Sequence, residues 1–571
     1  MRRKDQKTLL ITTLFFAILF LYVLCNFSAV KIHLPPTKFN HLSNSNLRLN
    51  YLIQEDVSLV SSVKYPELES VLLPDWEVLL IASADNPLSL DSVDQFIRYV
   101  CVFENNATSA VKFTGVLHFS KRATFKCVVP NSVRRLRPLG RPIVRRLNEY
   151  LMDEKGLKRK EIFRWSFLAY ETLSTEKDVI LFVKGVNNRQ GMNRPPEVLR
   201  CVFDNDVDYI VKTEVTSSSQ EVFRCNHPDE TEKRRLFAEG SRKIKISIEI
   251  TVGRRVIVPS VTYYEPKNIV EEKEGKSLLC ASTMVHNVGK FLKEWVVYHS
   301  NLGVEKFILY DNDSDDDLQK VVQDLVEEQY DVKTFLWPWP KTQEAGFSHS
   351  AIHGQDSCTW MMYTDIDEFV FSPSWLNSSY PSRDMLSAVL PPMTASLPPP
   401  SFSSDFLSRP IGQVSVRCLE FGPSNQKSHP IAGVTQGYTC RRKAENRHKS
   451  IVLLDVVDDS LRNVIHHFQL KEGYRTRTMS MQEGVVNHYK YQAWSEFKVK
   501  FRRRVSAYVV DWKQGVNPTS QDRTPGLGFE AIEPEGWDTK FCEVNDTRIK
   551  VATQRWFSLD STSGSKMAWQ E

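Results

Sequence analysis

Three regimes of hydrophobic and polar positions follow one another along the 571 residues of the chain. A basic tail and a long uncharged apolar run come first, and a polar stretch with two adjacent prolines follows them. Short apolar runs broken by turns come next and are typical of β-strands, whereas the second half alternates buried-strand and amphipathic-helix patterns. We therefore predict a tail at 1–7, a membrane anchor at 8–30, a stem at 31–75, a β-rich accessory domain at 76–266, an α/β domain at 276–557 and a C-terminal tail at 558–571.

The apolar run at 8–30 is long enough to cross a membrane. At about 1.5 Å per helical residue it covers roughly 34 Å, compared with a hydrocarbon core of about 30 Å. A cleaved signal peptide is the alternative, but the run is longer than a signal-peptide core and no small-x-small cleavage site follows it. Basic residues precede the run and only Lys31 follows it closely. The positive-inside rule therefore predicts a single-pass type II membrane protein with its bulk in the lumen, and we expect the membrane to be that of the Golgi.

A short pattern occurs twice in the β-rich stretch. The sequence Cys-Val-Phe at 101–103 precedes an aromatic-basic-Cys strand ending at Cys127, and Cys-Val-Phe at 201–203 precedes one ending at Cys225. The repeated pattern suggests two disulfides, Cys101–Cys127 and Cys201–Cys225. Because the pattern occurs only twice, its repetition by coincidence is the alternative. Nine of the ten cysteines follow the apolar run, so at least one of them lies outside any intramolecular pair. Between the two copies, residues 134–164 are basic and helix-like, which we interpret as a solvated helix face.

The second half predicts a parallel sheet. Strands are expected at four apolar runs, 278–285, 306–310, 332–337 and 359–363, with amphipathic helices after the first two. Strands and helices that alternate at these spacings favour right-handed parallel connections. Ligands of such sheets bind beyond the carboxyl ends of the strands, so functional residues are expected at that edge.

Two carboxylates, Asp365 and Asp367, interrupt the apolar sequence at the end of the fourth strand. In an extended chain, residues i and i+2 point to the same side, so both carboxylates could bind one cation. Mn²⁺ or Mg²⁺ takes carboxylate oxygens and leaves positions for phosphate oxygens, which the transfer of a sugar from a nucleoside diphosphate requires. A turn with helix-capping acids is the competing interpretation. A second acidic run, 311–317, is explained mainly as a helix cap, although Asp311 ends a strand and is expected to contact a nucleotide.

Composition narrows the alternatives. The chain has 74 basic and 69 acidic residues, a net charge of +5, which gives no reason to expect nucleic acid as a partner. The phosphate-binding loop of nucleotide triphosphatases is missing from the sequence. A metal-dependent hydrolase would also use paired acids, but the closely spaced His and Asp ligands expected of it are missing too.

Several ordered blocks between Ser277 and Phe557 resemble glycosyltransferase family 92, in its plant branch that includes the galactan synthases. The matching blocks are His286-Asn287, Glu294-Trp295, Tyr298-His299, Leu302 to Val304, Tyr310 to Asn312, Asp365 to Phe369, Phe421-Gly422, Lys449 to Ile451, His467-Phe468 and Asn487 to Tyr489. The resemblance implies an α/β domain of the GT-A type (Rossmann-like), Mn²⁺ dependence and inverting transfer from a UDP-sugar, UDP-galactose in the best-known members. It also suggests a carbohydrate-binding β-rich domain. Two departures are Val288, where the family commonly has Glu, and the Pro-rich stretch 391–400.

The remaining site residues are predicted as follows. His488 is expected to complete the metal shell, with His466 and His467 as alternatives, because neutral imidazole suits Mn²⁺. An inverting transfer needs a carboxylate base, for which Glu420 is the candidate, with Asp455 or Glu368 behind it. The UDP-sugar is expected to contact His286, Asn287, Asp311, Asn312 and Lys449.

Two functions from different classes remain at this point. The favoured one is a hexosyltransferase that uses a UDP-sugar donor and a glycan or cell-wall polysaccharide acceptor. The alternative is a membrane-anchored glycan-binding protein with a degenerate transferase domain, which Val288 keeps open and the intact Asp365/Asp367 pair opposes.

Overall fold

The computed structural model describes most of the chain after the predicted stem, and the described residues belong to one compact unit, Lys64–Glu571. The described ranges are 68–82, 99–146, 159–187, 192–204, 209–237, 244–266, 275–392, 409–464, 466–499, 533–559 and 566–570. The predicted tail, anchor and most of the stem fall outside these ranges. Within the described ranges, no helix has both the length and the apolarity needed to cross a membrane.

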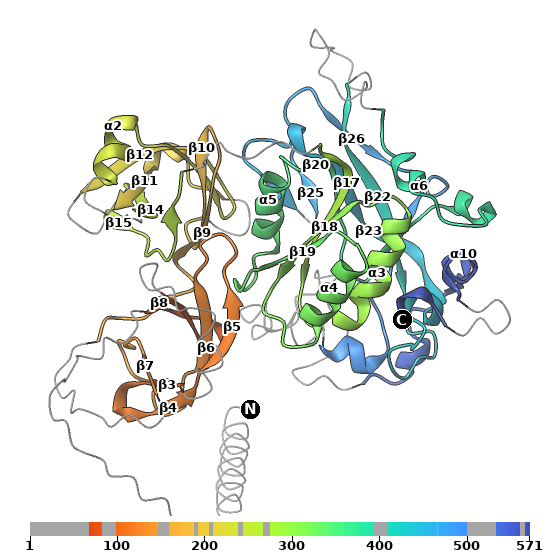
Figure 1. The fold of residues 1–571 in the computed structure, drawn as a ribbon, viewed down its shortest axis with the longest axis horizontal. Coiled ribbons are helices and arrows are strands. Elements are labelled where there is room, and N and C mark those ends of the chain that lie inside the picture. The colour runs from red at the N-terminus through yellow and green to blue at the C-terminus, as the bar shows by residue number, and fades with distance from the viewer. Residues whose placement is uncertain are drawn as a thin grey trace, which may run out of the picture. The chain divides into compact units, whose positions relative to one another are not determined.

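Among the described residues before 267, the regular secondary structure is mostly β-strand (Figure 1). A five-stranded sheet has the order β5-β6-β2-β1-β8, and a three-stranded sheet has the order β4-β3-β7. Their strands are β1 (Leu68–Leu72), β2 (Glu77–Ala82), β3 (Tyr99–Val102), β4 (Thr108–Ala110), β5 (Lys112–Val116), β6 (Ala123–Val128), β7 (Ile143–Arg146) and β8 (Phe163–Arg164). Strand β1 lies inside the stretch predicted as stem, and all five of its residues are in register with β2, from Leu68↔Ala82 to Leu72↔Val78.

An eight-stranded sheet follows, with the order β15-β14-β11-β12-β13-β10-β9 and β16 paired to β14. Its strands are β9 (Leu168–Ser174), β10 (Asp178–Lys184), β11 (Leu199–Asp204), β12 (Ile210–Ser219), β13 (Val222–Asn226), β14 (Ile244–Ile250), β15 (Val256–Ile257) and β16 (Tyr263–Tyr264); helix α2 (Glu230–Leu236) lies between β13 and β14. The two-residue period of β14 is clear, since Ile244, Ile246 and Ile248 are all fully buried in one core.

Both disulfides suggested by the repeated pattern are confirmed: Cys101–Cys127 and Cys201–Cys225. Two further disulfides, Cys280–Cys358 and Cys440–Cys542, lie in the second half of the chain. Cys418 is free and buried, which agrees with the odd number of cysteines after the apolar run.

The helix expected over 134–164 is wrong for the part of that stretch that the structure describes. Residues 143–146 form β7, which pairs with β3 from Val102↔Ile143 to Tyr99↔Arg146. Val144 is only 5% exposed and packs into a small core with Cys101 and Cys127. Pairing with a neighbouring strand thus decides the conformation against the helical spacing of the apolar residues.

A ten-stranded mixed sheet forms the core of the second half. Eight of its strands have the order β19-β18-β17-β20-β23-β22-β27-β21, while β26 pairs with β22 and β28 pairs with β23. Its parallel part is β17 (Ser277–Val285), β18 (Lys306–Asp311), β19 (Val332–Leu336) and β20 (Cys358–Tyr363), which matches the four predicted strands. The other strands are β21 (Glu368–Phe371), β22 (Ile411–Phe421), β23 (Cys440–Leu453), β26 (Arg475–Thr478), β27 (Val485–His488) and β28 (Val544–Asn545). A separate hairpin joins β24 (Asn463–Val464) to β25 (His467–Phe468).

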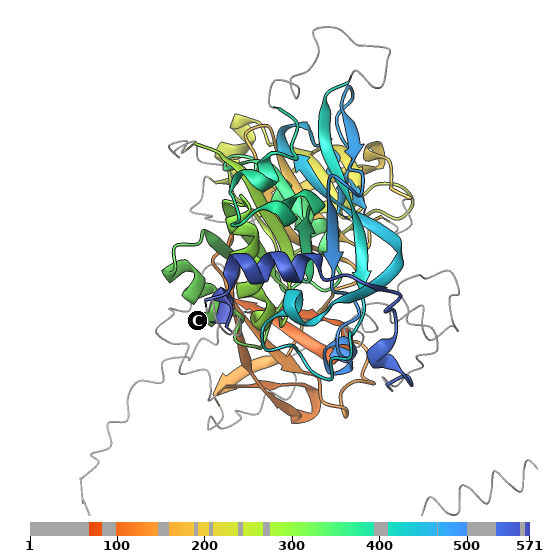
Figure 2. The ribbon, with the colours of Figure 1, turned by 90° about the vertical axis from the view of Figure 1, so that its right-hand side faces the viewer.

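Helices cover both faces of this sheet. Apolar residues of α3 (Gly289–Asn301) and α4 (Leu318–Glu327) share a core with Ala281 and Leu309. Residues of α5 (Gln343–His353) share the opposite core with Cys280 and Ile308. Because neighbouring residues of a strand face opposite ways, α3 and α4 lie on one face and α5 on the other, as Figure 1 shows. Helix α10 (Arg548–Phe557) crosses the antiparallel part of the sheet (Figure 2).

The β-rich region and the α5 face of the large sheet contribute to the same core. Trp165 stacks on Trp339 with ring centroids 5.6 Å apart, and Tyr170 and Phe182 make edge contacts with Trp337. All five side chains are at most 5% exposed. At the other end of the chain, Met567 and Trp569, predicted to belong to a tail, pack into the α3 core. These two residues therefore belong to the folded part of the chain.

Candidate active site

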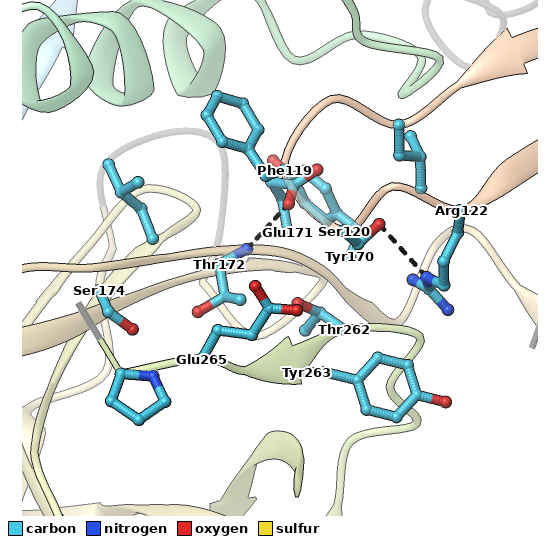
Figure 3. Close-up of a pocket in the computed structure, with 13 residues that line it drawn as sticks. Phe119, Ser120, Arg122, Tyr170, Glu171, Thr172, Ser174, Thr262, Tyr263 and Glu265 are labelled. Atoms are coloured by element: carbon cyan, nitrogen blue, oxygen red, sulfur yellow. Dashed lines mark hydrogen bonds between the residues drawn. The ribbon is translucent and has the colours of Figure 1, made fainter. Parts of the chain in front are cut away.

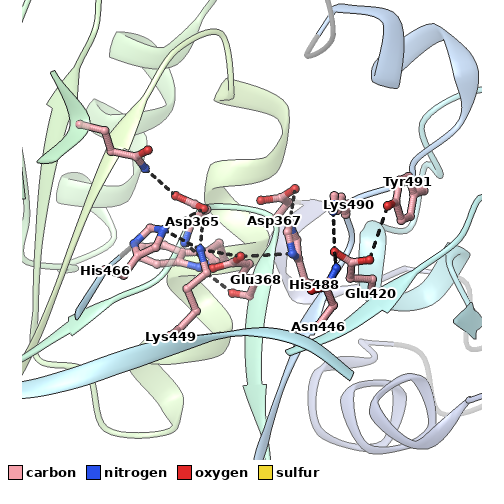
Figure 4. Close-up of polar contacts among 12 residues, drawn as sticks. Asp365, Asp367, Glu368, Glu420, Asn446, Lys449, His466, His488, Lys490 and Tyr491 are labelled. Atoms are coloured by element: carbon pink, nitrogen blue, oxygen red, sulfur yellow. Dashed lines mark hydrogen bonds and ion pairs between the residues drawn. The ribbon is translucent and has the colours of Figure 1, made fainter. Parts of the chain in front are cut away.

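The turn between β20 and β21 brings three carboxylates to the carboxyl edge of the parallel strands (Figure 4). The backbone N–H of Glu368 donates to the Asp365 carbonyl at 3.0 Å, and Glu368 Oε2 accepts from the Asp365 N–H at 2.9 Å. Because this segment is a turn and not an extended strand, the i, i+2 argument for Asp365 and Asp367 does not apply. Figure 4 shows the two side chains directed to different partners, one toward Lys449 and the other toward His488.

Asp365 belongs to the side of the site that carries Lys449. Its Oδ2 lies 2.8 Å from Lys449 Nζ and 3.5 Å from His466 Nε2, and its Oδ1 accepts from Gln343 Nε2 at 3.1 Å. The Asp365 side chain is 31% exposed. Burial opposes its ionisation, but Lys449 first, and then His466, outweigh burial and hold the pKa of Asp365 well below its usual range. Asp365 is therefore an ionised partner of Lys449 in this arrangement.

Asp367, Glu368 and His488 form a group that could hold a metal ion. One ligand atom from each of the three lies within 4.8 Å of the other two. The register of the sheet explains the grouping, because Glu368 in β21 lies directly opposite His488 in β27. His488 Nε2 is 3.6 Å from Asp367 Oδ2, and His488 Nδ1 is 3.4 Å from Glu368 Oε1. Two of the three predicted metal ligands are thus brought together, whereas Asp365 is not part of the group and Glu368 takes its place.

The donor set fits Mn²⁺ or Mg²⁺. Two carboxylates and one imidazole are ligand types that Mn²⁺ accepts, and three protein ligands leave positions for substrate oxygens. Glu368 Oε1 is buried and makes no hydrogen bond, although Lys449 Nζ lies 2.8 Å away and forms an ion pair with it. The Lys449 ammonium group is thus the partner of this oxygen, and the fit to a metal ion rests on the three ligand types and their spacing.

Lys449 links the two sides of the site. Its side chain is 6% exposed, and its ammonium group contacts Asp365, Glu368 and, at 2.6 Å, His466 Nε2. Burial disfavours the charged form, but the two carboxylates outweigh burial and raise the pKa of Lys449. His466, an alternative metal ligand from the sequence, therefore pairs with the lysine, in a left-handed backbone conformation at φ 69°.

Glu420 lies beside His488 but does not have the surroundings of a general base. Its side chain is fully buried, and its oxygens accept from Lys490 at 2.5 Å, Arg442 at 3.2 Å and Asn446 at 3.2 Å. Burial opposes ionisation, but Lys490 and the other donors lower the pKa of Glu420. The carboxylate is thus a buried counter-ion. The sequence prediction missed Lys490, whose signal is its place directly after the Asn-His-Tyr block.

Asp455, the other candidate base, does not join the site. Strand β23 runs antiparallel to β20, so Leu453 pairs with Trp360 near the amino end of β20. Asp455 follows Leu453 and lies 3.4 Å from Lys276, just before β17 begins. The residue therefore lies at the opposite edge of the parallel strands from Asp365. The third candidate, Glu368, is fully buried and sits between Lys449 and His488.

Four of the five residues predicted to bind the UDP-sugar lie at the ends of β17 and β18, and the fifth is Lys449 in β23. His286 Nδ1 lies 2.9 Å from the Asn312 carbonyl oxygen, and Asn312 Nδ2 donates to the Trp337 carbonyl at 2.7 Å. Asn287 and Asp315 exchange two hydrogen bonds, at 2.6 and 2.8 Å. Asp311 accepts from the Ser314 N–H at 2.9 Å and from Gln319 Nε2 at 3.2 Å. The four predicted residues thus order the loops of one sheet edge, and their contact with a nucleotide stays a prediction.

A separate pocket of about 200 Å³ lies in the β-rich region (Figure 3). Its wall includes Phe119, Arg122, Glu171, Tyr263 and Glu265. The Arg122 guanidinium stands over the Tyr263 ring at 4.9 Å from its centroid. Burial raises the pKa of Glu171 to about 7. The strand pattern of the sequence carries no signal for this pocket, because its wall comes from three segments that are far apart in the chain: 117–122, 170–174 and 262–266.

Acidic side chains, imidazoles and a lysine lie together at the carboxyl edge of the sheet. The chain is therefore an α/β protein whose site suits a cation and an anionic ligand. The sequence comparisons agree with this class and make it specific. Residues 276–520 match the profile of glycosyltransferase family 92. Similar proteins include family 92 proteins of Arabidopsis thaliana (39% identical over 429 residues, covering 74% of this chain and 71% of the relative) and Ricinus communis (41% over 400 residues, covering 68% and 67%). The chain belongs to glycosyltransferase family 92.

The resemblance seen in the sequence blocks is therefore confirmed, and the chain is a glycosyltransferase. Among solved structures, a mannosyltransferase of Pyrobaculum calidifontis in complex with GDP-Man and Mn²⁺ is 12% identical, with a TM-score of 0.22. The match covers 44% of this chain and 69% of that one. This likeness is too distant to say anything about the ligands of the present chain.

Proposed function

We propose that this chain transfers galactose from UDP-galactose, with inversion, to a glycan or cell-wall polysaccharide, through a metal-dependent GT-A-type domain. Membership of family 92 supports the reaction class. The observation that carries the metal dependence is the group Asp367, Glu368 and His488, in which one ligand atom of each residue lies within 4.8 Å of the other two.

The three residues of this group would hold the cation. A divalent cation supplies positive charge that offsets the charge developing on a diphosphate leaving group. Lys449 supplies a second positive charge from the chain itself, and Asp365 and Glu368 keep that lysine protonated and fixed. His286, Asn287, Asp311 and Asn312 would place the nucleotide along the neighbouring strand ends, where parallel sheets bind ligands.

UDP release tests the proposal. The full chain would be offered a panel of UDP-sugars with Mn²⁺ or with a chelator, beside two variants, Asp367→Asn and Asp455→Asn. Metal-dependent release from UDP-galactose that Asp367→Asn abolishes and Asp455→Asn keeps is the expected result. Asp455→Asn is the matched control, because it removes a carboxylate at the opposite sheet edge. Release that is insensitive to the chelator would contradict the metal role, and release from another donor alone would correct the sugar.

We propose further that the protein is a single-pass type II protein of the Golgi membrane, anchored by residues 8–30. The support is the uncharged apolar run and the basic flank before it. Asn106 and Asn377 each begin an Asn-x-Ser/Thr acceptor sequence for N-glycosylation. Glycosylation at either residue, detected as a mass shift that a deglycosylating enzyme removes, is expected for a luminal chain. A chain tagged at its C-terminus that stays accessible to protease in intact vesicles would contradict this topology.

The pocket of the β-rich region is proposed as a glycan-binding site. The Tyr263 ring and the polar groups of Arg122 and Glu171 are the kind of surroundings that sugar rings and hydroxyls use (Figure 3). Tyr263→Ala is expected to weaken retention of the full chain on immobilised acceptor polysaccharide, while donor hydrolysis stays unchanged. Unchanged retention on the polysaccharide would remove the support for this site.

A further inference from the structure

Strand β21 carries Glu368 and lies at the end of the ten-stranded sheet. Strand β27 pairs with one edge of β21, from Glu368↔His488 to Phe371↔Val485. In the part of the chain that the structure describes, no strand pairs with the other edge. An edge of this kind leaves backbone N–H and C=O groups that need partners when they are buried.

Three side chains of helix α3 supply those partners. Trp295 Nε1 donates to the Glu368 carbonyl at 3.0 Å, and the Tyr298 hydroxyl donates to the Val370 carbonyl at 2.7 Å. The Val370 N–H in turn donates to His299 Nε2 at 3.4 Å. All three side chains are fully buried. One turn of a helix thus takes the place of a neighbouring strand.

The chemistry of His299 suits this role. Its Nδ1 lies 2.9 Å from the Trp295 carbonyl oxygen, which can only accept, so Nδ1 carries the hydrogen and Nε2 is left as the acceptor for Val370. Burial lowers the pKa of His299 to about 3, which keeps the ring neutral. The ring also stacks on Phe369 at 5.5 Å, and the Tyr298 ring packs against Phe369 edge to face.

We propose that Trp295, Tyr298 and His299 are positioning residues that fix β21, and with it the Glu368 carboxylate, against His488. The inference rests on the proposed metal role of Asp367, Glu368 and His488. These three side chains touch no reacting atom. They hold the backbone from which Glu368 projects, so loosening them separates Glu368 from His488 and weakens cation binding without altering any ligand.

Tyr298→Phe tests this role with the smallest change, because it removes one hydroxyl and keeps the ring. Mn²⁺ binding to the full chain without donor, followed by the electron paramagnetic resonance signal of free Mn²⁺, is expected to weaken about two- to tenfold, the effect of one hydrogen bond. The concentration of Mn²⁺ that gives half-maximal UDP release should rise by the same factor, with kcat at saturating Mn²⁺ almost unchanged. Tyr264→Phe is the matched control, since it removes a buried hydroxyl that contacts His227 in the β-rich region.

Hydrogen exchange separates a failure of this inference from a failure of the proposed function. Amides of residues 368–371 are expected to exchange faster in Tyr298→Phe than in the wild type or in Tyr264→Phe. Unchanged exchange would overturn the inference whether or not the chain binds Mn²⁺. Faster exchange with unchanged Mn²⁺ affinity would also overturn it, because β21 would then be held without any effect on the site. A wild type that binds no Mn²⁺ would refute the proposed metal role itself.

Discussion

Two glutamates flank His488 across three neighbouring strands, and they differ in how their charge is satisfied. Glu420 in β22 pairs with His488 on one side, and Glu368 in β21 pairs with it on the other. Both side chains are fully buried. Glu420 is surrounded by Lys490, Arg442 and an amide, whereas Glu368 shares Lys449 with Asp365 and forms the three-residue group with Asp367 and His488. Burial is equal and both glutamates face His488, so their other partners distinguish the counter-ion Glu420 from the proposed metal ligand Glu368.

Removing the charge of Glu368 should have the largest effect on the reaction. Glu368→Gln keeps the shape of the side chain but removes a proposed metal ligand, so we expect a loss of about a thousandfold in kcat/KM, or about 4 kcal/mol. Steady-state UDP release measures it. Glu420→Gln assayed in parallel should lose far less activity per folded molecule. Equal losses in the two variants would mean that the difference in partners does not decide the roles.

Removing the charge of Glu420 should instead affect stability. Glu420→Gln leaves the buried Lys490 ammonium without its carboxylate, which costs about 3 kcal/mol in the free energy of unfolding. Chemical denaturation of the full chain measures this cost, with Glu445→Gln as a control that breaks a half-exposed ion pair with Arg417. A Glu420→Gln variant as stable as the wild type would show that the ion pair contributes little.

The pH dependence of stability should have opposite signs for two buried glutamates. Burial raises the pKa of Glu294 to about 7, with Thr435 and Val434 donors opposing the shift. Below the unfolded pKa of about 4.5, a carboxyl group with a raised folded pKa does not lower the free energy of unfolding. As pH rises from there to about 7, the group lowers the free energy of unfolding progressively, by up to about 3 kcal/mol. We therefore expect the Glu294→Gln variant to lose this decline between pH 4.5 and 7.

Glu420 should show the reverse dependence. The pKa of Glu420 is lowered in the folded chain, so its stabilisation is present above about pH 4.5 and is lost as pH falls through the folded pKa. Urea titrations at several pH values, compared among the wild type, Glu294→Gln and Glu420→Gln, measure both slopes. A decline between pH 4.5 and 7 that persists in Glu294→Gln would show that another group causes it.

The smallest expected effect concerns Asp365 and distinguishes it from Asp367. Asp365 pairs with Lys449 and lies outside the three-residue group, so Asp365→Asn should change the Mn²⁺ dissociation constant by no more than about threefold. Asp367→Asn should abolish detectable binding. Titration of free Mn²⁺ measures both. Equal losses in the two variants would restore the original expectation that the two aspartates act on one cation.

The sequence predicted the parallel sheet well, because runs such as 278–285 and 306–310 are apolar on both faces and need no knowledge of distant residues. The ordered motif blocks also led to the correct family. The site was harder, since its members meet through register between strands that are far apart in the chain. Glu368 faces His488 only because β21 pairs with β27, and Asp455 lies outside the site only because β23 runs antiparallel to β20. The ion pair between Glu420 and Lys490 depends on three-dimensional contacts that no local sequence pattern encodes.

The aromatic contacts between the β-rich region and the α5 face have a practical consequence for anyone who shortens this protein. A fragment beginning at residue 276 would look complete by sequence, since it holds the whole matched family segment. It would nevertheless leave Trp337 and Trp339, now fully buried, facing water where Trp165 and Tyr170 had covered them. Such a fragment would be prone to aggregate, and its inactivity would say nothing about catalysis. The segment that the family profile matches is therefore smaller than the unit that folds.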